Sequence, residues 1–452
     1  MHERFHYKTL DEVKAKAEEL GIDLPLSQQV ELLRQPLSVG GLKCANRMAI
    51  QPMEGCDGDL NGAPAELTKR RYNRFAASGA GLIWAEAVAV TPEGRANPRQ
   101  LMLTRENLDQ FKRLTESIRE RSRRLFNYEP VLVMQQTHSG RYSKPLGRPA
   151  PVIAVHNPVL EEKNPVTDDR IITDDGIKRL EEKYGESARL AEKAGFDGVD
   201  VKACHRYLLN ELLGAYERPG QYGGCFENRI RALCNSIEAV KANVASDFLV
   251  TGRFNIYDGM AYPHGFGVSP ESGLYFDSRE PVSLIKILHE KYGVELVNLT
   301  LGNPYFSPHI NRPFDMGPYI PKEHPLEGLE HMCRCIGEVK KACPQVKVMS
   351  SGNSYLRQFS VNMGAGMLER GWADLIGFGR MALAYPEFAK DMLEKGSLDP
   401  AKCCVACSKC SQLMRAGSTA GCVVRDHEVY FPIYRENVLE NERDIRHEVS
   451  GM

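Results

Sequence analysis

The chain has 452 residues, of which 42% are hydrophobic and 26% are charged, values ordinary for a soluble globular protein and unlike those of disordered or collagen-like chains. Lys and Arg number 58 against 59 Asp and Glu, so the net charge is -1 and no broad positive field is available for nucleic acid or a membrane surface. The N-terminus shows no signal-peptide core, and no apolar run approaches the roughly 20 residues of a membrane span. These features favour a cytosolic protein.

Residues 1–30 are predicted to form a polar helical extension. Leu10, Val13 and Ala17 recur at helical spacing, and Pro25 ends the pattern.

Eight short apolar runs follow, and a longer amphipathic stretch succeeds each of them. They span residues 47–52, 81–88, 131–136, 197–203, 247–253, 294–300, 346–351 and 373–379. Continuous apolar runs separated by helices are typical of parallel strands buried on both faces. The runs therefore predict an α/β fold, a TIM (β/α)8 barrel over residues 31–395, with a doubly wound open sheet as the alternative. The count of eight and the polar residues at the strand ends favour the barrel.

A linker then leads into a cysteine-rich segment at residues 396–426. The tail at residues 427–452 is charged and shows no clear core pattern.

Polar residues at the strand ends are the candidate site, because TIM-barrel active sites lie at the C-terminal ends of the strands. Gly352 and Gly379 follow the last two runs, with Ser351, Asn353 and Arg380 beside them. Glycine lets backbone N–H groups approach an anion, and the arginine guanidinium can donate two charged hydrogen bonds to it. These residues therefore predict a phosphate site. Ordinary βα turns are the alternative.

Two further pairs suit redox chemistry. Gln135 and Arg253 suit the pyrimidine edge of a flavin, because a carboxamide can pair with that edge and a cation stabilises reduced flavin. His205 and Tyr207 suit reduction of a conjugated C=C bond, in which one group polarises a carbonyl and a phenol delivers a proton. Each pair alone is a weak signal, since such side chains are often simply solvated or paired.

Several motifs together resemble the old yellow enzyme family of FMN-dependent oxidoreductases. They lie at residues 46–54, 70–95, 135–141, 197–213, 222–231 and 372–388, and the resemblance covers roughly residues 30–395. It implies an FMN-holding TIM barrel. By matching positions, it implies a flavin ring lined by Pro52, Met53 and Ala87, a pyrimidine edge bound by Gln135 and Arg253, and a phosphate held by Gly352, Asn353, Gly379 and Arg380.

The resemblance also implies substrate-binding residues. Family members usually place two polar groups before a catalytic tyrosine, and here these positions are Lys202 and His205, with Tyr207 as the proton donor. Lys202 stands where many relatives have His or Asn, and its charge suits a carboxylate or a strongly polarised carbonyl. Glu54 stands near the reactive edge of the flavin, where relatives often carry Cys or Thr. An ionised carboxylate there would disfavour anionic reduced flavin unless it is protonated or points away.

The C-terminal segment carries a metal-binding pattern. Cys404, Cys407, Cys410 and Cys422 form C-x2-C-x2-C-x11-C, which suits a [4Fe–4S] cluster and equally a four-thiolate zinc site. The position after the barrel favours the cluster, because the iron–sulfur branch of the family, which includes trimethylamine dehydrogenase and 2,4-dienoyl-CoA reductase, has its cluster there. Starting from Cys403 gives the C-x3-C-x2-C spacing of radical-SAM enzymes, which normally follows the first strand. Whether Cys403 replaces Cys404 stays open.

These features predict an ene-reductase, dependent on FMN and a [4Fe–4S] cluster, that reduces the C=C bond of a small α,β-unsaturated carbonyl or carboxylate. One alternative is an amine dehydrogenase of the trimethylamine dehydrogenase type. The sequence shows no evident aromatic cage to hold a cationic amine, which counts against this alternative. Another is an electron-transfer flavoprotein subunit. The sequence ends about thirty residues after Cys422, whereas members of the iron–sulfur branch continue there with nucleotide-binding domains. We therefore expect the electrons to come from a separate ferredoxin or flavoprotein, or from NAD(P)H bound over the flavin. A homo-oligomer is compatible with the sequence.

Overall fold

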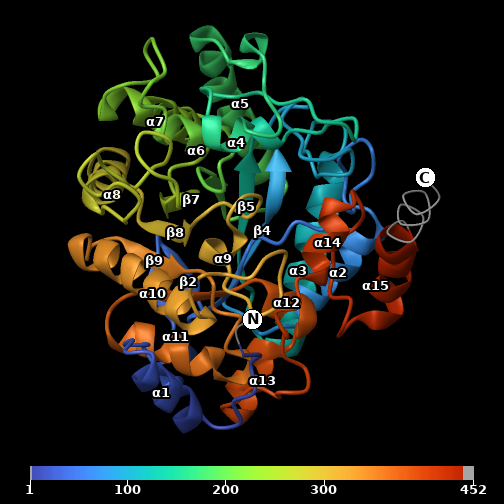
Figure 1. Ribbon diagram of the computed structural model, residues 1–452. Coiled ribbons are helices and arrows are strands. Elements are labelled where there is room, and N and C mark those ends of the chain that lie inside the picture. Colours follow the sequence, from blue (N-terminus) through green and yellow to red (C-terminus); the bar gives the residue numbers. More distant parts are fainter. Residues whose placement is uncertain (1–2, 441–452) are drawn as a thin grey trace, which may run out of the picture.

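A closed barrel of eight parallel strands forms the centre of the computed structural model, which describes residues 3–440 (Figure 1). In barrel order the strands are β3 (Met48–Ile50), β4 (Leu82–Ala89), β5 (Val131–Thr137), β6 (Gly198–Val201), β7 (Leu249–Tyr257), β8 (Leu296–Leu301), β9 (Lys347–Ser350) and β10 (Leu375–Phe378). Each strand overlaps one of the eight apolar runs. Because β10 pairs with β3 and closes the sheet, the TIM-barrel prediction is confirmed and the open sheet is excluded.

Helices surround the barrel, as the amphipathic stretches between the strands predict. The main helix after each strand is, in turn, α2 (Glu66–Ala76), α3 (Leu108–Phe126), α5 (Asp174–Lys193), α7 (Phe226–Lys241), α8 (Arg279–Tyr292), α10 (Pro325–Ala342), α11 (Ser360–Glu369) and α13 (Phe388–Lys395). In α3, for example, Phe111, Leu114 and Ile118 are buried at i, i+3 and i+7, which is the spacing of one helix face.

Short helices occupy the loops that follow the strands. They are α4 (Pro158–Glu161), α6 (Leu208–Leu213), α9 (Pro308–Asn311) and α12 (Arg380–Ala384). These loops lie at the C-terminal ends of the strands, which is the end of a TIM barrel that carries active sites.

A two-stranded hairpin closes the opposite end of the barrel, and the sequence did not reveal it. It consists of β1 (Leu37–Val39) and β2 (Leu42–Cys44) in antiparallel register. Leu37 and Val39 pack in one buried cluster with Leu82 and Leu249, which begin two of the barrel strands. The hairpin therefore acts as an apolar plug at the N-terminal ends of the strands.

The N-terminal extension contains helix α1 (Leu10–Glu19) and then continues against the barrel. The helix ends before the predicted boundary at Pro25, because Gly21 takes a left-handed conformation with φ of +67°. Beyond it, the backbone N–H of Ser27 donates to the carbonyl of Asn362 at 3.0 Å, and Asn362 Nδ2 donates back at 2.9 Å. Asn362 lies in α11, so these bonds fasten the extension to the last part of the barrel.

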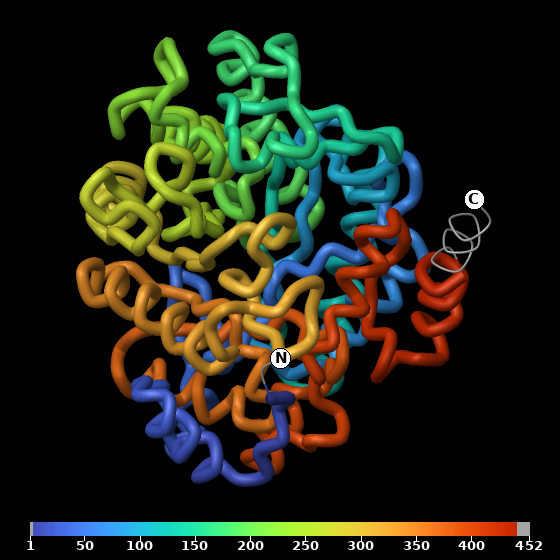
Figure 2. The backbone as a smooth tube through the Cα atoms, in the orientation of Figure 1, coloured from blue at the N-terminus to red at the C-terminus, as the bar shows by residue number. Residues whose placement is uncertain are grey.

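The segment that follows the barrel lies against its first βα unit, and Figure 2 shows the two far-separated parts of the chain side by side. It forms α14 (Lys409–Arg415) and α15 (His427–Tyr434). Asp426, directly before α15, accepts hydrogen bonds from Arg70 at 2.7 and 2.9 Å and another from Arg74, both in α2. An acid in the C-terminal segment is thus clamped by two arginines of the barrel.

The tail and the cysteine-rich segment before it share a small core, although the tail sequence showed no clear core pattern. This core consists of Leu413, Val423, Tyr430, Tyr434 and Val438. Two of its five residues are tyrosines, which combine an apolar ring with a polar hydroxyl and therefore weaken the hydrophobic pattern in the sequence. Residues 441–452 of the predicted tail lie outside the described residues.

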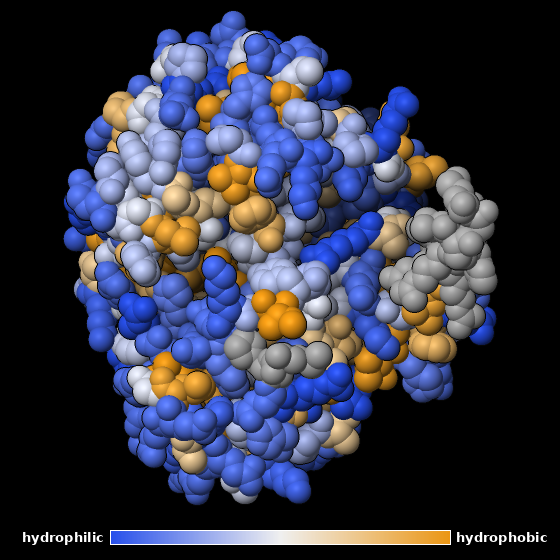
Figure 3. Space-filling model, in the orientation of Figure 1, coloured by the Kyte–Doolittle hydropathy of each residue, from blue (hydrophilic) through white to orange (hydrophobic). Residues whose placement is uncertain are grey.

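The molecular surface is that of an ordinary globular domain. Figure 3 shows one face that is mostly hydrophilic, with hydrophobic residues in small separate groups. Within residues 3–440, no helix combines the length and the apolar character needed to cross a membrane.

Candidate functional site

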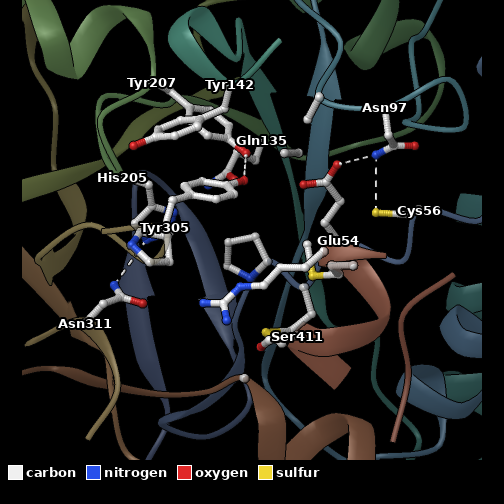
Figure 4. Close-up of a pocket in the computed structure, with 18 of the residues that line it drawn as sticks. Glu54, Cys56, Asn97, Gln135, Tyr142, His205, Tyr207, Tyr305, Asn311 and Ser411 are labelled. Atoms are coloured by element: carbon white, nitrogen blue, oxygen red, sulfur yellow. Dashed lines mark hydrogen bonds between the residues drawn. The ribbon is translucent and has the colours of Figure 1, made fainter. Parts of the chain in front are cut away.

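A large open cavity lies among the loops that follow the barrel strands. Its volume is about 710 Å³, within the range of small-molecule and cofactor sites. Figure 4 shows Tyr207, Tyr142 and His205 on one side of it and Glu54 with Asn97 on the other. The predicted site residues that line this one cavity are Pro52, Met53, Glu54, Ala87, Gln135, Lys202, His205, Tyr207, Arg253, Gly352, Gly379 and Arg380.

Two of the residues predicted to contact the cofactor, Ser351 and Asn353, lie behind the cavity wall. Ser351 Oγ accepts a long hydrogen bond of 3.4 Å from Arg253 Nη2. Asn353 Nδ2 donates to Ser350 Oγ at 2.9 Å and to the carbonyl of Gly377 at 3.0 Å. The βα turn directs both side chains into the barrel interior, so they support the site without lining it.

Asp200, which sequence reasoning missed, organises one end of the cavity. It is fully buried, and its carboxylate accepts hydrogen bonds from Gln135 Nε2 at 2.6 Å, Trp84 Nε1 at 2.8 Å and the backbone N–H of Arg253 at 2.6 Å. The bond to Asp200 uses one N–H of the Gln135 amide, so the other N–H and the amide oxygen remain to pair with a ligand. The available signal was a carboxylate in the middle of an apolar strand.

The chain after β6 turns sharply and directs two predicted residues into the cavity. His205 and Arg206 both adopt left-handed conformations, with φ of 65° and 59°. Such conformations cost free energy in residues other than glycine and persist where the surroundings fix them. Here Arg206 is buried and donates to Asp258 Oδ2 at 2.9 Å. This anchored arginine lets its two neighbours, His205 and Tyr207, face the cavity.

His205 is held as a neutral imidazole. Burial, together with the charges of Arg253 and Lys202, lowers its pKa well below the ordinary value. Asn311 Nδ2 lies 3.3 Å from His205 Nε2. The two hydrogens of this amide also face Thr300 Oγ1 at 3.1 Å and the carbonyl of Leu301 at 2.9 Å, and a neutral imidazole carries one N–H on one of its ring nitrogens. His205 can therefore donate a hydrogen bond to a carbonyl group.

Three tyrosines form a cluster beside this histidine, and two of them were not expected. Tyr207 OH and Tyr305 OH are 2.8 Å apart, and the rings of Tyr305 and Tyr142 stack with centroids 3.9 Å apart. Lys202 Nζ lies 4.0 Å from the centroid of the Tyr207 ring. Burial raises the pKa of Tyr207 well above its ordinary value, so its phenol stays protonated. Tyr142 and Tyr305 could have been noticed in the sequence, because each is an aromatic residue shortly after the end of a strand, β5 or β8.

Glu54 faces the opposite side of the cavity, where its environment favours the protonated carboxyl more than water does. Burial raises its pKa to about 7, although Lys202 opposes the shift. Asn97 Nδ2 donates to Glu54 Oε1 at 3.2 Å and lies 3.2 Å from Cys56 Sγ. A carboxyl group with a pKa near 7 is about half protonated at neutral pH, so it adds less negative charge to the cavity than an ordinary glutamate.

The far end of the cavity fits the phosphate of the FMN expected from the sequence. Gly352 adopts a left-handed φ of +83°, and a Cβ there would overlap the sulfur of Met332. Gly379 and Arg380 line the same end, and Arg380 Nη1 is buried with no hydrogen-bond partner among the described residues. A buried guanidinium without a partner is costly, and an anion at this place would satisfy it.

The C-terminal cysteines present thiols with backbone donors aimed at them. The N–H of Ala406 donates to Cys404 Sγ at 3.4 Å, and the N–H of Arg425 donates to Cys422 Sγ at 3.3 Å. Hydrogen bonds of this kind stabilise thiolates and tune iron–sulfur clusters. Burial raises the pKa of the Cys404 thiol to about 12, and the nearby Cys410 and Cys422 add to the rise. The donor set therefore suits metal-bound thiolates.

The structure distinguishes the two adjacent cysteines. Cys403 Sγ donates to the carbonyl of Asp399 at 3.3 Å, so it is engaged away from the other thiols. In the part of the chain that the structure describes, no three His, Cys, Asp or Glu side chains form a group that could hold a metal ion. The choice between an iron–sulfur cluster and a four-thiolate zinc site therefore stays a prediction from the cysteine spacing.

The cavity is strongly cationic. The positively charged side chains that line it are Arg99, Lys144, Lys202, Arg253, Arg312, Arg380 and Arg415. Within residues 3–440, none of these seven forms an ion pair with a carboxylate, and Glu54 is the one acidic side chain in the lining. In a protein of net charge -1, such a concentration of unpaired cations indicates anionic ligands.

Comparison with known proteins agrees with this geometry. The family described as NADH:flavin oxidoreductase / NADH oxidase matches residues 32–266, which is more than half of the chain. Cinnamate reductase of Clostridium sporogenes is 25% identical over 418 residues, which cover 88% of this chain and 58% of that protein.

Solved structures show the same fold. A 2-naphthoyl-CoA reductase bound to 2-naphthoyl-CoA superposes with a TM-score of 0.70 at 20% identity, over 91% of this chain and 58% of the other. Histamine dehydrogenase from Rhizobium sp. 4-9 gives a TM-score of 0.66 at 18% identity, over 87% and 52%. The chain thus spans between 52% and 58% of the length of these three relatives. With its closed barrel and this family match, the chain belongs to the NADH:flavin oxidoreductase / NADH oxidase family, the old yellow enzyme family of FMN-dependent oxidoreductases.

Proposed function

We propose that the chain is an ene-reductase, dependent on FMN and a [4Fe–4S] cluster, that reduces the C=C bond of an α,β-unsaturated carbonyl or carboxylate. The observation that carries this proposal is the convergence of Lys202, His205 and Tyr207 on the cavity that also contains Gln135 and Arg253. Donors for a carbonyl, a proton source and the expected flavin-binding groups thus share one space. The similarity to a cinnamate reductase supports the same reaction class.

The substrate-side residues have complementary tasks. The N–H of the neutral His205 imidazole and the Lys202 ammonium stabilise the negative charge that develops on the carbonyl oxygen. The phenol of Tyr207 donates its proton to the α-carbon. Tyr305 is 42% exposed and its hydroxyl is 2.8 Å from that of Tyr207, so it links the donor to solvent and allows reprotonation.

FMN, when bound, supplies the hydride that adds to the β-carbon. We infer that Pro52, Met53, Glu54 and Ala87 pack beside its ring system. Gln135 and Arg253 bind the pyrimidine edge, while Gly352, Gly379 and Arg380 bind the phosphate. Ser351 and Asn353 position these groups from behind the wall.

We assign Cys404, Cys407, Cys410 and Cys422 as ligands of the cluster, which would exchange single electrons with the flavin. The flavin site then belongs to residues 31–395 and the cluster site to residues 396–426. NAD(P)H or a separate ferredoxin or flavoprotein would supply the electrons.

Amine oxidation is the second candidate, and the cluster of Tyr142, Tyr207 and Tyr305 favours it, because aromatic faces attract alkylammonium ions. Two observations weigh against it. Lys202 already lies over the Tyr207 ring at 4.0 Å, and the Tyr142 and Tyr305 rings stack on each other with no gap for a ligand. The unpaired cations of the lining would also repel an ammonium substrate. Ene-reduction is therefore favoured.

Anaerobic spectroscopy tests the proposal. Protein prepared without oxygen should contain FMN, iron and sulfide, with flavin bands above a broad iron–sulfur absorption. After reduction with dithionite and removal of the excess, cinnamate or cyclohexenone should restore the oxidised flavin spectrum. Protein that stays colourless and takes up no added FMN would refute the flavin site. Bleaching of oxidised flavin by amines, with no reoxidation by any enone or enoate, would favour the amine dehydrogenase.

A further inference from the structure

Arg312 is a cavity cation that has no task in the proposed reaction. It directly follows the short helix α9 and lines the cavity. Its neighbour Asn311 is fixed by bonds to Thr300 Oγ1 at 3.1 Å and to the carbonyl of Leu301 at 2.9 Å, and it contacts His205. Arg312 therefore projects from a well-anchored point next to the residue that faces the substrate carbonyl.

The guanidinium of Arg312 is held without a neutralising partner. Its Nη1 donates to Ser411 Oγ, and its Nε is buried with no hydrogen-bond partner among the described residues. Burial and the like charge of Arg380 lower its pKa to about 10, and the nearby Cys410 opposes the shift. No carboxylate pairs with it in the part of the chain that the structure covers. An arginine kept partly buried beside another arginine calls for an anion.

FMN leaves this requirement unmet. Its phosphate is matched by Arg380 with Gly352 and Gly379, and the charge of its reduced ring by Arg253. Lys202 and His205 are already the two donors for the conjugated carbonyl. Arg312 is thus left facing a second anionic group, and the planar fork of a guanidinium matches a carboxylate.

We propose that the substrate is an organic anion and that Arg312 binds a carboxylate separate from the conjugated carbonyl group, which makes it a specificity-determining residue. This inference rests on the proposed ene-reductase function and narrows its substrate class. The exposed rim cations Lys144 and Arg415 add a positive field at the entrance, which would draw anions in and would weaken with added salt.

A matched pair of alkenes tests the proposal. Monomethyl fumarate has a conjugated ester and a separate carboxylate, whereas dimethyl fumarate has the same alkene without charge. With FMN-loaded protein, Arg312→Gln should raise KM for monomethyl fumarate roughly 10- to 100-fold and change KM for dimethyl fumarate little. Arg312→Lys should recover part of the loss. Arg148→Gln removes an exposed cation outside the cavity lining and serves as the charge-matched control.

Binding of an unreactive analogue gives a readout that does not depend on turnover. Binding of monomethyl succinate is followed by its perturbation of the oxidised flavin spectrum. It should bind to Arg312→Gln roughly 10- to 100-fold more weakly than to the natural protein, whereas dimethyl succinate should bind equally to both proteins. Equal effects on the acid and the diester would overturn the proposal, as would loss of FMN from the variant, which would make Arg312 a phosphate ligand. If no alkene is reduced, the proposed function fails, while the succinate titration still decides whether Arg312 binds the carboxylate.

Discussion

Replacing Tyr207 with phenylalanine separates proton delivery from every other property of the site. The change removes the phenol hydroxyl and keeps the ring, so the contact with Lys202 Nζ at 4.0 Å from the ring centroid is retained. A positioned general acid contributes about 10²- to 10⁴-fold to a rate. We therefore expect Tyr207→Phe to slow alkene reduction by about that factor and to leave reduction of the flavin unchanged.

The structural cost of the same change is small. The hydroxyl of Tyr207 makes one hydrogen bond, at 2.8 Å to Tyr305 OH, and a neutral bond of this kind is worth about 1 kcal/mol. Tyr305 is 42% exposed, so its hydroxyl can bond to water instead. The expected kinetic effect corresponds to roughly 3–5 kcal/mol of transition-state free energy. The loss of rate therefore exceeds what a loss of folding stability could explain.

Anaerobic stopped-flow measurement of the two half-reactions provides the assay. Reduction of the flavin by dithionite or NAD(P)H is timed first, and reoxidation of the reduced enzyme by an enone is timed separately. Tyr128→Phe is the control, because it also removes a partly buried phenol hydroxyl, which donates to the carbonyl of Gly79 at 2.5 Å and accepts from Asn46 Nδ2 at 3.3 Å, and Tyr128 does not line the cavity. Equal slowing of both half-reactions in Tyr207→Phe, or no slowing of reoxidation, would refute the role as proton donor.

Three other outcomes are expected. Burial raises the pKa of Glu54 from 4.5 to about 7, so the folded protein keeps a proton that the unfolded chain releases and loses stability as pH rises through this range. At pH 8, Glu54→Gln should therefore have a free energy of unfolding higher than that of the natural protein by up to about 3 kcal/mol, and it should unfold at a higher temperature. Both differences should shrink towards pH 4. Cys404→Ser should lose most of its iron and sulfide and Cys403→Ser should keep them, as metal analysis can check; the reverse result would exchange the two assignments. Asp426→Asn should weaken the hydrogen bonds to Arg70 by about 1–3 kcal/mol and speed amide hydrogen exchange in α15. Unchanged exchange in α15 would show that these bonds do not hold the C-terminal segment on the barrel.

The barrel can be predicted from the sequence alone. Each parallel strand is buried on both faces, so its residues form an uninterrupted apolar run, and eight such runs are visible without any knowledge of contacts. Because the C-terminal ends of parallel strands meet at one end of a barrel, residues as distant in sequence as Gln135 and Arg380 were predicted to share a site, and they line the same cavity.

Contacts between distant loops were decided only by the tertiary structure. The stacking of Tyr142 on Tyr305 joins loops that follow two different strands, and neither sequence neighbourhood marks it. The anchoring of Gln135 by Asp200 depends on the register between β5 and β6. Each strand of the hairpin at the base of the barrel has only three residues, which is too short to leave a periodic pattern in the sequence.

Charge state is the other property that the sequence could not supply. The sequence does not show whether a glutamate or an arginine is solvated or enclosed. In the structure, burial raises the pKa of Glu54 to about 7, and Arg312 has no carboxylate partner within residues 3–440. The spacing of the cysteines likewise allowed Cys403 or Cys404 to serve as a ligand, and the hydrogen bond of Cys403 to Asp399 favours Cys404. Spacing along a chain fixes which residues can meet, whereas desolvation and the direction of each side chain are set by atoms brought from elsewhere in the fold.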